Sequence, residues 1–167
     1  MNPEVMSMRD IAAHDLERLL ALNNAYAAEV NALTLEDFTQ AVRIAAAART
    51  VDGLPAFVIA FDERTPSRGP NHAWFLAREP AFLYVDRVVV AATAQRLGLG
   101  RRLYQDLLTI ADGRPLCCEV NIEPPNQASL TFHERLGFTP CGEATDPRNQ
   151  KRVRYLLLQR MPRPALA

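Results

Sequence analysis

The segment VVVAATAQRLGLGRRLYQDLLTIA, residues 88–111, constrains the fold of this chain more than any other. It begins as the end of an apolar strand and continues, after Gly98 and Gly100, with leucines at the four-residue spacing of one helix face. Glycines let a backbone approach a ligand closely, and the free N–H groups and dipole of a helix N-terminus attract phosphate. The segment therefore predicts an α/β fold with a candidate phosphate-binding turn. The alternative is a glycine turn that only redirects the chain.

The rest of the chain predicts a mixed sheet with helices on its faces. We expect a first strand ending at 9–11, a hairpin over 49–63 around Asp52–Gly53, and strands over 81–92, 115–122, 138–144 and 151–160. Helices are expected over 14–30, 35–48, 99–111 and 126–137, with a long loop over 64–80. Trp74 and Phe75 in that loop would line a substrate pocket or anchor the loop on the core. The order β-α-α-β-β-β-α-β-α-β-β indicates one mixed α/β domain over residues 1–167.

Composition excludes several classes of function. The 19 basic and 19 acidic residues balance to zero formal net charge, whereas nucleic-acid binding needs a basic excess or stripe. No apolar run approaches the ~18 residues of a membrane span, and the N-terminus lacks the order of a signal peptide. Three cysteines, two of them adjacent, form neither a disulfide framework nor a zinc motif. We expect a cytoplasmic protein with no metal, and with neither a membrane nor a nucleic acid as partner.

The glycine segment fits one phosphate-binding pattern and fails two others. A P-loop needs Gly-Lys-Ser/Thr after its first glycine, and a Rossmann fingerprint needs a third glycine where Leu103 stands. The pattern Gln/Arg-x-x-Gly-x-Gly/Ala, residues 95–100, resembles the acetyl-CoA-binding motif of the GNAT superfamily of N-acetyltransferases. The segment NQASLTFHERLGF, residues 126–138, resembles that superfamily's later motif and follows one strand downstream. The resemblance covers about residues 82–144, and FLYVDRVVV and CEVNIEPPN look like a group of bacterial predicted acetyltransferases.

The resemblance implies a GNAT-like fold and acetyl-CoA as the acetyl donor. N–H groups from Gln95 to Arg101 would hold the CoA pyrophosphate, and the backbone of strand 88–90 would bind the pantetheine arm. The side chains of Arg96 and Arg101 would pair with phosphates or simply be solvated. The implied cofactor-binding residues are Val88, Val89, Val90, Gln95, Arg96, Leu97, Gly98, Leu99, Gly100, Arg101, Asn126 and Ser129.

On the leaving-group side, the resemblance points to His133. The family's usual acid there is a tyrosine, which this chain replaces with His133. Imidazole can bond a thiol, and imidazolium can donate a proton, so His133 could serve as the acid. A water or Tyr104 is the alternative. Asn126, Ser129 and His133 recur three to four residues apart and so share one helix face.

Two carboxylates on expected central strands are candidates for the general base. Glu119 resembles the strand glutamate that serves as base in the ribosomal-protein alanine acetyltransferases, and Asp86 is the second candidate. A charge within an apolar strand is costly unless it is paired or used. The alternatives are an ion pair of Asp86 with an arginine other than Arg87, and exposure of Glu119 where two strands splay apart. The adjacent cysteines, Cys117 and Cys118, are expected to be buried strand residues rather than nucleophiles.

These features together predict an acetyl-CoA-dependent N-acetyltransferase. A primary amine would attack the thioester directly, without a covalent acyl-enzyme. The acceptor would be a small molecule, and the alternative, from the similarity at Glu119, is a protein N-terminus. A homodimer is expected by analogy with the family. The loop over 63–81 and the region between the first two helices would choose the acceptor. An acyl-CoA-binding or regulatory module without turnover, or a structural α/β domain that binds nothing, are the rival interpretations.

Overall fold

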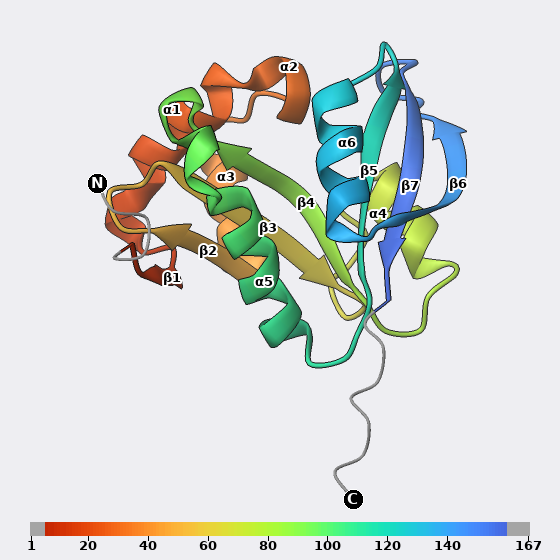
Figure 1. Cartoon of the computed structure of the whole chain (residues 1–167), viewed down its shortest axis with the longest axis horizontal. Helices are drawn as coiled ribbons and strands as arrows, with labels where there is room; N and C mark the ends of the chain where they lie inside the picture. Colours follow the sequence, from red (N-terminus) through yellow and green to blue (C-terminus); the bar gives the residue numbers. More distant parts are fainter. Residues whose placement is uncertain (1–5, 160–167) are drawn as a thin grey trace, which may run out of the picture.

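The computed structural model describes residues 6–159 (Figure 1). The strands are β1 (Met8–Asp10), β2 (Ala47–Val51), β3 (Ala56–Asp62), β4 (Leu83–Val90), β5 (Leu116–Glu123), β6 (Thr139–Thr145) and β7 (Arg152–Leu158). The α-helices are α1 (Leu16–Ala25), α2 (Ala27–Val30), α3 (Leu35–Ile44), α4 (Pro70–Leu76), α5 (Leu99–Ala111) and α6 (Gln127–Leu136). Two 3-10 helices, η2 (Ala13–Asp15) and η3 (Ala92–Leu97), complete the described elements.

The strands form one sheet with helices on both faces. Its order is β1-β2-β3-β4-β5-β7-β6, and every neighbouring pair is antiparallel except β4 and β5. One apolar cluster packs the sheet against α5 and α6, and a second packs the opposite face against α1, α3 and α4. Because both faces are covered, six of the seven residues of β3 are buried. The predicted mixed α/β fold is confirmed. No helix within residues 6–159 is long and apolar enough to span a membrane.

A β-bulge in β4 decides where the sheet opens. Ile59 of β3 pairs with Arg87 and Ala60 pairs with Val85, so Asp86 has no partner in β3. Such an extra residue bends its strand and interrupts the alternation of side chains. Val85 and Val88 both pack on the α5 side of the sheet, which leaves Asp86 and Arg87 together on the opposite face.

Beyond the bulge, β4 separates from β5. The two strands pair only at Leu83–Leu116 and Tyr84–Cys117, although they continue to Val90 and Glu123. Figure 1 shows them diverging from their common lower end. The divergence leaves one edge of β4 without a neighbouring strand and opens a gap in the middle of the sheet.

The prediction of a loop over 64–80 is wrong at its centre, where the chain forms α4. Pro70 occupies the start of this helix, a position at which its fixed φ is favourable and its missing N–H costs nothing. Trp74 stacks on Tyr155 with ring centroids 4.1 Å apart, and Phe75 is fully buried. The two aromatic residues therefore anchor α4 on the sheet.

Three other expected boundaries shift. The helix predicted over 14–30 is interrupted at Tyr26, whose φ of −113° and ψ of 31° separate α1 from α2. The helix predicted over 35–48 ends at Ile44, because Ala47 already begins β2. The strand predicted over 151–160 is observed as β7, Arg152–Leu158, and residue 160 lies outside the described residues. In the sheet, β7 lies between β5 and β6.

The packing of β6 on α4 predicts a large effect of Gly142→Ala. The backbone of Gly142 is ordinary, but an added Cβ would lie 2.5 Å from the Trp74 ring. Relief of this overlap would disturb the stacked Trp74–Tyr155 pair, so we expect a loss of about 1–3 kcal/mol in the free energy of unfolding. Urea unfolding measures the loss. Thr145→Ala, an exposed change on the same strand, is the control. Equal unfolding midpoints for Gly142→Ala and the unmodified protein would show that the contact is not tight.

Candidate active site

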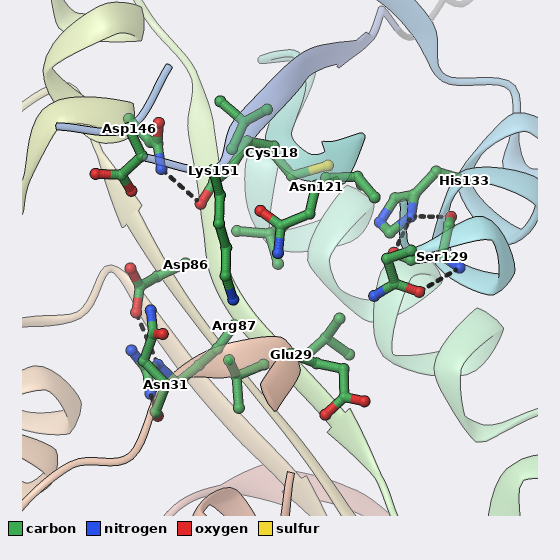
Figure 2. A pocket seen from close by; sticks show the side chains of 18 of the residues that line it. Glu29, Asn31, Asp86, Arg87, Cys118, Asn121, Ser129, His133, Asp146 and Lys151 are labelled. Carbon is green, nitrogen blue, oxygen red and sulfur yellow. Dashed lines mark hydrogen bonds and ion pairs between the residues drawn. The ribbon is translucent and has the colours of Figure 1, made fainter. Parts of the chain in front are cut away.

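A pocket lies where β4 and β5 part, and we call it the β4–β5 pocket (Figure 2). Charged and polar side chains line it, among them Asp86, Arg87, Glu119, Asn121, His133 and Lys151. They come from β4, β5, α6 and the residue before β7, segments distant in sequence that meet where the strands diverge.

Glu119 is the pocket's acid with neutral partners. The Tyr84 hydroxyl donates to its Oε2 at 2.7 Å, and the Asn71 amide donates to its Oε1 at 3.1 Å. The Tyr155 hydroxyl in turn donates to Asn71 Oδ1 at 2.9 Å and fixes the amide. Removal from water raises the pKa of Glu119 to about 7, against the smaller lowering effect of the Tyr84 hydrogen bond. Glu119 can therefore both accept and release a proton near neutral pH.

Asp86, the second carboxylate, is held in an ion pair. Arg87 Nε lies 2.9 Å from Asp86 Oδ2, and Arg87 Nη1 donates to Asn23 Oδ1 at 2.9 Å. The expectation that a different arginine would pair with Asp86 is wrong. The reason is the bulge, which places two consecutive side chains on one face.

His133 is buried and both of its ring nitrogens are engaged. Nδ1 lies 2.7 Å from the Ser129 backbone oxygen, which can only accept, so Nδ1 carries the proton. Nε2, 2.6 Å from the Tyr104 hydroxyl, is then the acceptor, and Tyr104 donates to it. Burial lowers the pKa of His133 and raises that of Tyr104. At neutral pH the arrangement is a neutral imidazole that orients a tyrosine hydroxyl.

A second hollow, the α5–α6 groove, runs along the free edge of β4. Its walls include the predicted residues Val88, Val89, Val90, Gln95, Gly98, Gly100, Arg101, Asn126 and Ser129. The β4–β5 pocket and the α5–α6 groove share Val88, Ser129 and His133, so they are continuous. The N–H groups at the first turn of α5 have no acceptors within the helix and lie at this groove.

The two glycines of the turn have different geometric reasons. Gly98 is left-handed, at φ 70° and ψ 19°, where a side chain would be strained. A Cβ on Gly100 would lie 3.0 Å from the Phe132 ring of α6. The turn thus offers close backbone access next to a helix N-terminus, which suits a phosphate group.

The remaining residues predicted to bind the cofactor differ in how they relate to the groove. Arg96 is exposed and lies outside the groove walls, whereas Leu97 and Leu99 direct their side chains into the core. Asn126 caps α6, accepting the Ser129 N–H at 3.2 Å. Ser129 in turn contacts His133, and all three residues line the β4–β5 pocket.

Sequence reasoning missed four residues of the pocket region. Asn71, Tyr84 and Tyr155 form the network around Glu119, and Lys151 projects into the pocket (Figure 2). The Gly-Pro pair before Asn71 was an available signal for a helix start, but nothing in the sequence indicated the contacts across strands.

The residues to consider for sulfur and metal chemistry are the two adjacent cysteines of β5 and the side chains that could hold a metal ion. Cys117 and Cys118 are buried in β5, as predicted, and burial raises the pKa of both thiols, which disfavours the reactive thiolate. Within residues 6–159, no three His, Cys, Asp or Glu side chains are grouped so as to hold a metal ion.

The family model described as Acetyltransferase (GNAT) family matches residues 44–138, more than half of the chain. That range includes both sequence motifs and confirms the resemblance that they carry. A search of curated protein sequences found no significant match.

Several solved structures have a similar fold. Arabidopsis thaliana NAA60, in complex with a bisubstrate analogue, has a TM-score of 0.71 and 16% identity over 93% of this chain and 98% of that one. The ribosomal-protein-S18-alanine N-acetyltransferase from Escherichia coli has a TM-score of 0.67 and 15% identity over 98% and 99%. The protein yncA from Salmonella typhimurium, with its cofactor acetyl-CoA, has a TM-score of 0.66 and 16% identity over 97% and 99%. At these identities the likeness shows the fold.

The raised pKa of Glu119 predicts how stability changes with pH. The folded protein keeps a proton on Glu119 up to about pH 7, whereas the unfolded chain releases it near its ordinary pKa of 4.5. The stabilisation is therefore complete below about pH 4.5 and is lost as pH rises through about 7. We expect the unfolding midpoint of the unmodified protein to fall across this window relative to Glu119→Gln. Parallel curves for the two proteins, measured by thermal unfolding, would contradict the assignment.

Proposed function

The chain belongs to the GNAT family of acetyltransferases, and on that premise we propose that it transfers the acetyl group of acetyl-CoA directly to a primary amine of a small-molecule acceptor. One observation carries the proposal: the β4–β5 pocket and the α5–α6 groove meet at the free edge of β4. A donor in the groove and an acceptor in the pocket would therefore meet at one point.

The groove suits the CoA part of the donor. The first turn of α5 would hold the pyrophosphate with N–H groups and the helix dipole, and Arg101 stands beside it. The unpaired edge of β4 at Val88–Val90 would bind the amides of the pantetheine arm as a neighbouring strand would. The same edge offers N–H groups to the oxyanion of the tetrahedral intermediate.

We assign Glu119 as the general base. The amine nitrogen attacks the thioester carbonyl, its proton passes to Glu119, and the carbon–sulfur bond breaks to release CoA as a thiolate. A carboxylate with a pKa of about 7 is well matched to this step at neutral pH. Asp86 is less suited because Arg87 neutralises it, so it remains the second candidate.

On the leaving-group side we assign His133 and Tyr104 as one unit. A neutral His133 has no proton on Nε2 to donate, so the predicted acid role passes through its partner. In the resting site the single proton of the Tyr104 hydroxyl is donated to His133 Nε2, and it would turn toward the sulfur as negative charge develops there, while His133 keeps the phenol ring in place.

We further propose that the enzyme acts in the cytoplasm. The three cysteines are free, and two of them lie side by side in β5. A chain with reduced thiols fits a reducing compartment.

The calorimetric titration of acetyl-CoA tests the donor site. We expect micromolar binding by the unmodified protein and its loss in Gly100→Glu, since the new side chain would occupy the space beside Phe132 and repel phosphate. Gln105→Glu, an exposed change on the same helix with the same added charge, should bind normally. Binding that survives Gly100→Glu would move the donor elsewhere, and binding without thiol release for any amine would favour a non-catalytic acyl-CoA-binding module.

Substitution of the two carboxylates tests the base. Loss of a general base typically costs roughly 100-fold to 10,000-fold in rate, so we expect a fall of that size in kcat for Glu119→Gln, with an unchanged KM for acetyl-CoA. In the unmodified enzyme, kcat/KM for the acceptor should rise with pH through an apparent pKa of about 7. A larger loss in Asp86→Asn than in Glu119→Gln would transfer the role to Asp86.

A further inference from the structure

The charges of the β4–β5 pocket do not all pair with one another. Asp86 is bound to Arg87, and Asp146 accepts two guanidinium nitrogens of Arg148, the shortest contact at 2.8 Å. Glu119 has only neutral partners. Lys151 is the only lysine of the chain, and its ammonium has no hydrogen bond or ion pair within residues 6–159.

Lys151 is placed inside the pocket. Its side chain is half-buried and extends from the residue before β7 into the space that Asp86, Arg87 and Asn121 border (Figure 2). Lys151 is attracted to the Asp146 carboxylate, but Arg148 takes the hydrogen bonds of that carboxylate and the ammonium makes none with it. A half-buried ammonium without a hydrogen-bond acceptor favours an anionic ligand at this place. The remaining acidic residue of the walls, Glu29, is exposed at the rim.

Glu119 and Lys151 line the same pocket. Tyr155 of β7 pairs with Glu119, and Lys151 comes one residue before β7 begins at Arg152. Lys151 is four residues before Tyr155, which is roughly 13 Å of extended chain. The lysine stem and the glutamate side chain take up part of this length, so a molecule that touches both ends is short.

Resting on the acetyl transfer proposed above, we infer that the acceptor is a small amino acid, its amine directed to Glu119 and its carboxylate held by Lys151. The ammonium of Lys151 matches the carboxylate end of such a molecule, and the proton-accepting Glu119 matches its amine end. A phosphate group carries more charge and is usually bound by several arginines or a helix N-terminus. Here one ammonium is left over, because Arg87 and Arg148 are engaged with Asp86 and Asp146.

The inference is tested by pairs of acceptors that differ only in the carboxylate. Thiol release from acetyl-CoA is measured with free amino acids, with 3- and 4-carbon amino acids whose amine is terminal, and with the corresponding amides. We expect a KM for the acids roughly tenfold to hundredfold below that for the amides, the usual value of a hydrogen bond to a charged group. Equal KM values for acids and amides would overturn the inference and leave acetyl transfer intact.

Substitution of Lys151 provides a second test of the inference. In Lys151→Met the KM for the acids should rise roughly tenfold to hundredfold, so that the acids lose their advantage over the amides, and Lys151→Arg should restore most of the preference. Arg152→Met removes the same charge at the next residue, whose guanidinium pairs with Glu123 and Glu143. It should behave like the unmodified enzyme. A preference for acids that survives Lys151→Met would overturn the assignment.

Two further outcomes separate this inference from the function on which it rests. Activity restricted to peptide N-termini followed by an acidic residue, and lost in Lys151→Met, would replace the free amino acid with a protein acceptor. If no amine releases thiol, calorimetric titration of the CoA-bound protein with the amino acids shows whether the amino acid site exists. Binding that depends on Lys151 would support the amino acid site and count against acetyl transfer. Absence of binding would contradict both the amino acid site and acetyl transfer.

Discussion

The divergence of β4 from β5 is the constraint on which the rest of the structure depends. Two parallel strands buried in the middle of a sheet would normally pair along their length, yet these pair at two positions only. The bulge at Asp86 turns β4 away, and the gap supplies both an unsatisfied strand edge and a polar pocket in the centre of an otherwise apolar sheet. Backbone that would have bound a neighbouring strand is left free to bind a ligand.

The same bulge separates the chemistry of the two central carboxylates. It sets Arg87 beside Asp86, which neutralises that acid, while Glu119 on the facing strand receives only hydroxyl and amide donors. Desolvation without a countercharge raises the pKa of Glu119 into the neutral range. Two acids that look alike in the sequence thus differ in their surroundings: Asp86 lies in an ion pair, whereas Glu119 has the raised pKa that suits the base proposed for it.

The sequence predicted the fold and the groove better than the pocket. Helix periodicity, the Gly98–Gly100 turn and the motif over 126–138 are local signals, and the structure places their residues around one groove. Contacts across strands have no such signal. Tertiary pairing sets three features that the sequence does not show. It places Tyr155 opposite Glu119, it creates the bulge that directs the Arg87 side chain to the face of Asp86, and it supports α4 inside a segment that looked like a loop. For the same reason Lys151, isolated in sequence, could not be assigned to the site before the strands were placed.

Backbone amide hydrogen exchange with and without acetyl-CoA tests the account most directly, because the free edge of β4 is its central claim. We predict that saturating acetyl-CoA slows exchange at residues 88–90 and at the first turn of α5, residues 98–101, since both segments gain hydrogen-bond acceptors. Acetyl-CoA that binds while exchange in both segments is unchanged would contradict the account, for the donor would then lie somewhere other than between the parted strands.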